Sequence, residues 1–276
     1  RVRAGQVVVA GGVIGTLRLL FRCRDETRSL PRLSPRLGEG VRTNSEALFG
    51  VMSRDRQTDY SQGVAITSVI KADDVTHVEP VRFSDGSSFI RLLAAPMIKR
   101  NARVSINLLA TLAAILRHPL TFLDVKFFAR WARRATILLV MQTEDNRLRL
   151  KPGRGPLTLF RRGLVSERDS AQPIAPDEAM THRIAHAFAD RTDSVPQASF
   201  TESLLGMAST AHILGGCVMG RSAEEGVVDI TCQVFNYPGL YVVDGSILPA
   251  NPGINPSLTI AALAEYAMSH IPPKPR

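Results

Sequence analysis

Residues 7–21 read VVVAGGVIGTLRLLF, and this stretch decides the class of fold. The β-branched run from Val7 to Val9 ends in glycines, which is typical of a buried parallel strand. The residues that follow predict a helix with Thr16 as its N-cap. A strand, a glycine turn and a helix make the βα unit of an α/β domain. Gly12-x-x-Gly15 is only part of the G-x-G-x-x-G nucleotide pattern, and a purely structural turn explains it equally well.

A second strand followed by a helix is predicted near the C-terminus. Residues 239–246, GLYVVDGS, read as a strand that closes on Asp244. Asn255 as N-cap and Pro256 at the first helical position then predict a helix over residues 258–270. Both ends of the chain therefore predict parts of one α/β domain.

The middle of the chain has a different character. Four stretches predict strands of an antiparallel sheet: residues 47–52, 63–70, 76–83 and 136–143. Helices are predicted over residues 104–116, 120–134 and 176–191. The resulting organisation is two domains, α/β and α+β in style, in which residues 46–200 are inserted between residues 1–45 and 201–276.

The predicted helices raise the questions of membrane contact and of metal binding. The apolar run at 104–116, roughly 13 residues, is too short for a bilayer that needs ~20. The basic amphipathic stretch at 120–134 fits either a membrane surface or packing on its own sheet, and packing is the commoner fate. His182 and His186 have the spacing of metal ligands, but no Glu accompanies them and no metal is expected.

Composition narrows the class of protein. The 276 residues carry a net charge of +9, and 45% of them are hydrophobic. A basic chain suits nucleic acid, an anionic membrane or a phosphate-bearing ligand, but no basic run with interleaved aromatic residues favours nucleic acid. Three cysteines without metal spacing indicate reduced thiols in a cytoplasmic protein. No signal peptide is visible, and a start at Arg1 inside a fold-like stretch indicates a fragment of a longer chain.

Residues 209–220, STAHILGGCVMG, hold the candidate chemistry. Glycines after His212 allow a backbone segment or a flat ligand to come close. A base at His212, together with a hydrogen-bonding amide and the positive end of a helix at Asn255, suits removal of a proton while negative charge builds on a neighbouring ring, and Asp244 closes a strand where ligands of α/β sheets bind. On spacing alone, plain packing is the more frequent explanation of such residues.

Three quoted stretches bear a family resemblance. HILGG at 212–216 and GLYVVDGSILPANPGINPSLTIAALAE at 239–265 closely resemble the C-terminal signature of the glucose–methanol–choline (GMC) flavin oxidoreductases. Residues 7–46 resemble the middle signature of the same family, and THVEPVRF at 76–83 looks most like the bacterial cholesterol oxidase branch. The resemblance implies FAD as cofactor, an FAD/NAD(P)-binding Rossmann-like domain and an inserted substrate domain.

The resemblance also implies roles for single residues. His212 falls on the active-site histidine, which accepts or positions the substrate hydroxyl proton, and Asn255 on the asparagine that orients the alcohol. The remaining matches are cofactor-binding positions: Ala10 and Gly11 near the adenine half, Asp244 and Gly245 at the flavin's chain, and Asn255, Pro256 and Ser257 at the pyrimidine side of the ring. The glycines after His212 are then expected to let the chain pass the planar cofactor.

Two departures limit what is carried over. Residues 91–97, RLLAAPM, lack the carboxylate that cholesterol oxidases use for double-bond isomerisation. Glu79 is the best replacement, with a surface ion pair as the commoner explanation. The N-terminal G-x-G-x-x-G is also missing, so the chain as given is expected to hold FAD poorly.

The expected function is oxidation of a bulky hydrophobic alcohol, such as a 3β-hydroxysteroid, with O2 as acceptor and H2O2 as product. The apolar helices would cover the substrate or touch a membrane. A dehydrogenase for another hydrophobic alcohol and a catalytically inactive sterol- or lipid-binding relative stay open as alternatives. A Ser-His-Asp hydrolase is disfavoured because the sequence has no G-x-S-x-G elbow.

Overall fold

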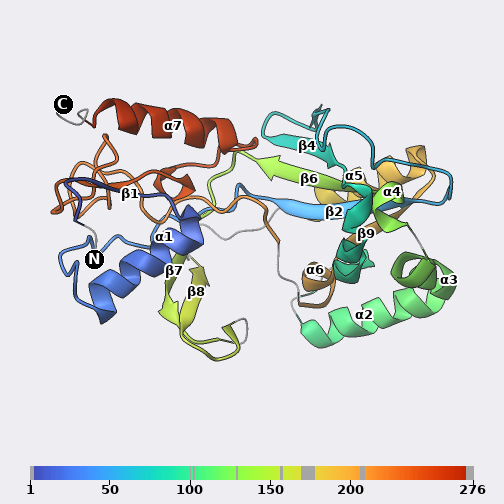
Figure 1. The fold of residues 1–276 in the computed structure, drawn as a ribbon. Coiled ribbons are helices and arrows are strands. Elements are labelled where there is room, and N and C mark those ends of the chain that lie inside the picture. Colours follow the sequence, from blue (N-terminus) through green and yellow to red (C-terminus); the bar gives the residue numbers. More distant parts are fainter. Residues whose placement is uncertain are drawn as a thin grey trace. The chain divides into compact units, whose positions relative to one another are not determined.

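The chain forms two compact units in a computed structural model, which describes residues 3–99, 101, 103–128, 130–155, 158–168, 178–205 and 209–271. Unit 1 comprises Arg1–Ser45, Thr143–Ile174 and His212–Arg276, and unit 2 comprises Glu46–Gln142 and Ala175–Ala211 (Figure 1). The mixed architecture with an antiparallel sheet confirms the predicted fold class.

Unit 1 combines a βα unit with long loops and a hairpin. Its regular elements are β1 (Val7–Val9), α1 (Gly12–Phe21) with a wider turn η1 (Arg22–Glu26), β7 (Leu148–Gly153), β8 (Gly163–Arg168), β10 (Leu240–Val242), η5 (Gly245–Ile247) and α7 (Ser257–Ser269). β1 pairs in parallel with β10, with Val8 opposite Tyr241. Leu17 and Leu20 of α1 are buried in the core of this unit. Val7 and Val8 are 48% and 44% exposed, so β1 is not the buried strand that its composition predicts.

The β7–β8 hairpin lies in unit 1, although the sequence-based boundaries assign it to the inserted domain. Val41 and Leu148 exchange two backbone hydrogen bonds of 2.9 and 2.7 Å, and Leu150 is buried in the unit 1 core. These contacts tie the hairpin to a segment more than a hundred positions earlier in the chain. The assignment of the two units to cofactor and substrate stays a prediction.

Thr16 has a different role from the predicted N-cap. Helix α1 begins at Gly12, so Thr16 lies inside the helix. Its hydroxyl accepts a hydrogen bond from the Gly11 N–H at 3.2 Å and donates to Asp244 Oδ2 at 2.5 Å. The side chain therefore links the helix to the end of β10.

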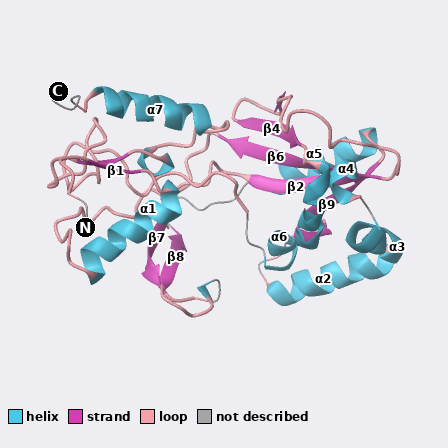
Figure 2. Ribbon diagram, viewed as in Figure 1, coloured by secondary structure: helices cyan, strands magenta, loops and turns pink. Residues whose placement is uncertain are grey.

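Unit 2 is built on a six-stranded antiparallel sheet in the order β3–β4–β6–β2–β9–β5. Its strands β4, β6 and β2 are seen side by side in Figure 2. Its elements are β2 (Ala47–Ser53), β3 (Ile70–Lys71), β4 (Thr76–Val81), η2 (Asp85–Leu93), β5 (Ala94–Pro96), α2 (Val104–Arg117), α3 (Pro119–Leu123), η3 (Asp124–Phe128), α4 (Trp131–Arg134), β6 (Ala135–Gln142), α5 (Glu178–Arg191), β9 (Ser194–Ser199) and α6 (Phe200–Leu205). Alternate side chains fill two cores: Phe49 and Leu138 pack with Ala185 of α5, and Met52 packs with Trp131 on the other face.

The strands predicted at 47–52, 76–83 and 136–143 are confirmed to within a few residues. The strand predicted at 63–70 is wrong, since only Ile70–Lys71 pairs as a strand there, with an isolated bridge at Ile66. Val64 is 69% exposed, so the apolar side chains of this stretch lack a core to pack against. Within the described residues no single helix has the length and composition to span a membrane, although α2 and the segment Pro119–Phe127, bent by 98°, satisfy both criteria together.

Candidate functional site

Asp244 connects the end of β10 to two neighbouring segments. The residue is buried, and its Oδ2 accepts the Thr16 hydroxyl while its Oδ1 accepts the Ser246 N–H at 2.8 Å. A buried carboxylate is costly unless it is hydrogen-bonded, and both of its oxygens have donors here. The turn after β10 is therefore held rigidly against α1.

The segment that carries His212 runs beside this turn. Gly215 donates its N–H to the Gly245 carbonyl at 2.9 Å, and Cys217 donates to the Ser246 carbonyl at 2.8 Å. The neighbouring Leu214 exchanges two backbone hydrogen bonds with Arg42. The structure thus brings the half-buried His212 to the same end of unit 1 as Asp244 and Gly245.

The glycine pair after His212 serves the chain's own packing. Gly215 has φ +74°, and a Cβ there would overlap the Gly40 carbonyl oxygen. Gly216 has φ +98°, and its Cβ would stand 2.8 Å from Leu17 Cδ1. Backbone and α1 fill the space on the Cβ side of both glycines, and the expectation that they let the chain pass a planar cofactor stays a prediction. Close approach of another backbone segment, the other reading of this motif, is what the structure shows.

A pair of buried amides that the sequence analysis missed holds the loop before α7. Asn251 Oδ1 accepts the Asn44 N–H at 3.0 Å, and its Nδ2 donates to the Glu144 carbonyl at 2.7 Å. In return, Asn44 Oδ1 accepts the Gly253 N–H at 2.9 Å, and Asn44 Nδ2 donates to the Ile254 carbonyl at 3.1 Å. The loop is fixed as far as the residue that precedes Asn255. The only sequence signal for these contacts was the presence of asparagines in stretches that predict turns.

Helix α7 presents an uncapped N-terminus at this loop. It begins at Ser257 with Pro256 as N-cap and no side-chain cap, one residue later than the predicted start with Asn255 as cap. Proline has no backbone N–H, so it is tolerated both as N-cap and at the first helical position. The sequence therefore does not decide between the two helix starts. Leu258 is 81% exposed and the first turn holds no acidic residue. The open N–H groups and the positive end of the helix dipole favour an anionic partner.

α7 and the turn after β10 are in contact. A Cβ on Gly245 would lie 3.4 Å from Ile260 Cδ1 of α7 and 3.5 Å from the Ile213 carbonyl oxygen. The His212 segment, the Asp244–Gly245 turn and the first turns of α7 therefore meet at one place. This is the part of the predicted site that the structure assembles.

The predicted adenine-side residues lie at the end of β1. Ala10 and Gly11 are exposed, and α1 starts directly after them without a side-chain cap. A Cβ on Gly12 or on Gly15 would meet nothing within 4 Å, so the backbone of this turn is unshielded. Two helix N-termini offer N–H donors to the anionic groups of a flavin nucleotide, and the buried Asp244 carboxylate is an acceptor suited to a hydroxyl group.

Glu79 belongs to the other unit of the chain. It is 4% exposed within β4, opposite Leu139, so it is not a surface ion pair. It belongs to unit 2, and its catalytic role stays a prediction. Another buried carboxylate of unit 2 was missed: Glu46 Oε2 accepts the Thr210 hydroxyl at 2.7 Å and the Ala211 N–H at 2.6 Å. Glu46 therefore holds the backbone directly before His212.

No group of three or more His, Cys, Asp or Glu side chains suited to a metal ion occurs in the described part of the chain. His182 and His186 lie one turn apart on α5 with their ring centroids 6.3 Å apart.

Comparison with known proteins places these features in a family. Residues 161–264 match the family model described as GMC oxidoreductase. A cholesterol oxidase from Acinetobacter baumannii is 40% identical over 273 residues, which cover 99% of this chain and 48% of that protein. A cholesterol oxidase from Mycobacterium tuberculosis is 38% identical over 279 residues, 98% of this chain and 47% of that protein. The chain thus spans about half the length of these relatives.

A comparison with solved structures shows a similar fold. The crystal structure of pyridoxine 4-oxidase from Mesorbium loti superposes with a TM-score of 0.53 at 17% identity, over 96% of this chain and 51% of that one. GMC oxidoreductases are FAD-binding flavoproteins, so FAD is the cofactor of this group. The family-model match over residues 161–264 and the near-complete alignment of this chain with cholesterol oxidases together confirm the resemblance: the chain belongs to the GMC oxidoreductase family.

Proposed function

We propose that the full-length protein is an FAD-dependent oxidoreductase that converts the CH–OH group of a hydrophobic alcohol into a carbonyl. The observation that carries this proposal is the meeting of the His212 segment, the Asp244–Gly245 turn and the open N-terminus of α7 in unit 1. Membership of the GMC family supports the same reaction class.

In the proposed reaction the chain's own residues handle the proton and the charge. The imidazole of His212 takes the hydroxyl proton, and the Asn255 amide orients the hydroxyl group. The N–H groups at the start of α7 stabilise negative charge that develops next to them. Asp244, held by Thr16, keeps the turn in place. Bound FAD supplies the acceptor for the hydride that leaves the alcohol carbon.

The substrate class rests on the relatives and on unit 2. Two cholesterol oxidases at 40% and 38% identity support a sterol 3β-hydroxyl group, with O2 as final acceptor and H2O2 as product. Exposed apolar side chains on α2 and α3 support contact with a membrane that contains the substrate: Leu108, Leu109, Leu112, Leu116 and Leu120. The double change Leu109→Glu with Leu112→Glu should then reduce cosedimentation with vesicles of anionic lipid and cholesterol, without altering the secondary structure seen by circular dichroism. Equal cosedimentation would remove the membrane contact from the proposal.

The double-bond isomerisation of cholesterol oxidases is not part of this proposal. Residues 91–97 carry no carboxylate, so the expected product is the unisomerised ketone. If Glu79 substitutes for the missing group, the wild type releases the isomerised ketone and Glu79→Gln does not. Chromatography of the products distinguishes the two results.

The central test is flavin reduction in the full-length protein. His212→Ala should lower the rate of flavin bleaching by cholesterol about 10²–10⁴-fold, the usual contribution of a positioned general base, while the bound FAD content stays the same. His212→Gln, which keeps a hydrogen-bonding side chain without the base, should be nearly as slow. Normal bleaching in both variants would overturn the mechanism. Saturable sterol binding by the wild type with no bleaching at all would instead support an inactive sterol-binding relative.

A further inference from the structure

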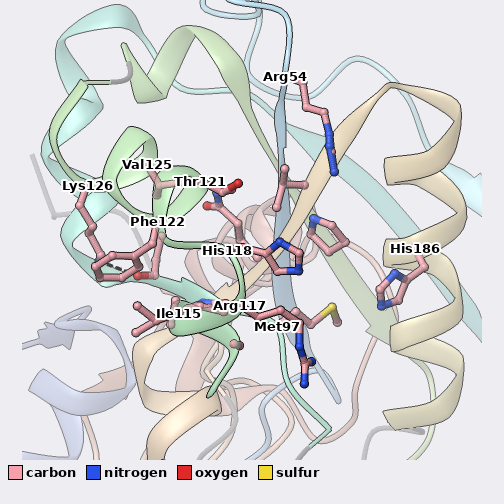
Figure 3. Close-up of a pocket in the computed structure, with 17 residues that line it drawn as sticks. Arg54, Met97, Ile115, Arg117, His118, Thr121, Phe122, Val125, Lys126 and His186 are labelled. Carbon is pink, nitrogen blue, oxygen red and sulfur yellow. Dashed lines mark hydrogen bonds between the residues drawn. The ribbon is translucent and has the colours of Figure 1, made fainter. Parts of the chain in front are cut away.

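Unit 2 contains a pocket of ≈410 Å³, a volume within the range of small-molecule sites. It is bounded by the end of α2, α3, the edge strand β5 with its neighbour β9, and α5 (Figure 3). Apolar groups make up most of its wall: Ala94, Ala95, Pro96, Met97, Ala114, Ile115, Phe122, Val125, Val195 and Pro196.

The charged groups of the pocket wall are all of one sign. Among the described residues, its lining contains Arg54, Arg117 and Lys126, together with His118 and His186, and no Asp or Glu. Figure 3 shows His118 and His186 on opposite walls, on the α2–α3 turn and on α5. A low-dielectric cleft lined by one sign of charge attracts ligands of the opposite sign.

The Lys126 ammonium group is fully hydrogen-bonded within the protein. It donates to the carbonyl oxygens of Arg91 at 2.9 Å, Leu92 at 3.2 Å and Ala94 at 2.6 Å. Burial lowers the pKa of Lys126, while these three acceptors favour its charged form. An ammonium group has three donors, so none is left for a ligand.

Arg117 is placed differently. It is exposed at the last turn of α2, and no ion pair involves it within the described residues. Arg54 lies 3.6 Å from Asp193, with both side chains largely in solvent. A guanidinium group binds a carboxylate through two parallel N–H donors, which makes Arg117 the best anchor for an anionic head group.

A second polar group of the lining lacks a partner. Gln197 is 6% exposed, and its Oε1 accepts the Trp131 indole N–H at 3.4 Å. Its Nε2 is fully buried and has no hydrogen-bond partner. A buried donor without an acceptor is unfavourable, and a ligand oxygen at this point would satisfy it.

We propose that this pocket binds an amphipathic carboxylate, with the acid at Arg117, the apolar body against the alanine- and proline-rich wall, and a second oxygen at the Gln197 amide. This binding function goes beyond the oxidation proposed above and does not depend on it. Two sources share the required chemistry, a hydroxylated steroid acid and a hydroxylated fatty acid, and the test distinguishes them.

Trp131 is the only tryptophan among these 276 residues and is hydrogen-bonded to Gln197, so its emission responds to the pocket, and loss of the response in Trp131→Phe assigns the signal in the full-length protein. We would titrate the full-length protein with lithocholate, its methyl ester and 12-hydroxylaurate at pH 8, and repeat the measurement by equilibrium dialysis with labelled ligand. At least one of the two acids should bind saturably, and which acid binds identifies the source. For a steroid source, the ester should bind at least about tenfold more weakly than the acid.

The variants test the contacts one at a time. Arg117→Gln should weaken binding of the acid about tenfold and leave the ester unchanged, whereas Gln197→Met should weaken both. Arg103→Gln is the matched control, because Arg103 is exposed at the other end of α2 and does not line the pocket. The proposal is overturned if neither acid binds, if the ester binds as well as its acid, or if Arg117→Gln and Arg103→Gln have equal effects.

Discussion

The two units are stabilised in different ways. Unit 2 has a six-stranded sheet whose long central strands β2 and β6 bury side chains on both faces. In unit 1, the sheet that carries the candidate site has only two short strands, β1 and β10, and the neighbouring loops are held by glycine contacts and buried amides. The conspicuous sequence motifs belong to unit 1, because a close approach or a buried hydrogen bond requires one particular residue type. A sheet face accepts many apolar residues.

The largest expected effect is Gly215→Ala in unit 1. A Cβ at this left-handed position overlaps the Gly40 carbonyl oxygen, so backbone strain and overpacking should together cost about 4 kcal/mol of unfolding free energy. Urea unfolding followed by far-UV circular dichroism measures this loss. Gly12→Ala is the control, since φ is +67° there and nothing lies within 4 Å of the new atom, and it should cost only about 1 kcal/mol. Similar losses in both variants would show that the contact is unimportant.

Arg134→Met tests whether unit 2 also depends on a single polar group. Arg134 is 4% exposed, pairs with Asp124 at 2.9 Å and donates to the Ser53 carbonyl at 2.7 Å. Removing one partner of a buried ion pair should cost about 3 kcal/mol, measured by the urea dependence of Trp131 emission. The adjacent Arg133→Met removes an exposed pair with Asp85 and should cost less than about 1 kcal/mol. If Arg134→Met is equally mild, apolar packing alone carries unit 2.

Asn251→Leu tests the amide network before α7. The substitution removes an acceptor from the Asn44 N–H and a donor from the Glu144 carbonyl, at a cost of about 2 kcal/mol. Hydrogen exchange followed by mass spectrometry should show faster exchange in the peptide that contains Asn255. Asn236→Ala, in an exposed loop of the same unit, should leave that peptide unchanged. Unchanged exchange in Asn251→Leu would mean that α7 alone positions the loop.

The smallest effect concerns two buried thiols of unit 1. Burial raises the pKa of Cys217 to about 12 and that of Cys232 to about 11, from 9.0. The unfolded thiols ionise first as pH rises above 9, so the stability that they contribute is present below pH 9 and is lost towards pH 11–12. Cys217→Ala should reduce the loss between pH 8 and pH 10 by about 1 kcal/mol, judged from urea midpoints at both values. An identical pH dependence in the variant and the wild type would assign the alkaline loss to other groups.

Much of unit 2 could be predicted from local patterns, and the exceptions are instructive. The apolar runs at 47–52 and 136–143 correspond to β2 and β6, because both stretches have a partner strand on each side. Residues 63–70 are also rich in apolar and β-branched side chains, yet only Ile70 belongs to a strand, with an isolated bridge at Ile66. Periodicity reports which side chains prefer burial, and only a partner strand decides whether they obtain it.

By itself, the sequence determined the α/β class, the returning chain, the family and the residue types His212, Asp244 and Asn255, because these are carried by local periodicity and by short motifs. The tertiary structure alone decided what those residues touch. Thr16 binds Asp244 across 228 positions, and Asn44 reaches Asn251 across 207. The polar groups that line the pocket of unit 2 come from separate elements, so no spacing of residues along the chain predicts the pocket. Contacts of this kind depend on distances in space, which a sequence specifies only through the whole fold.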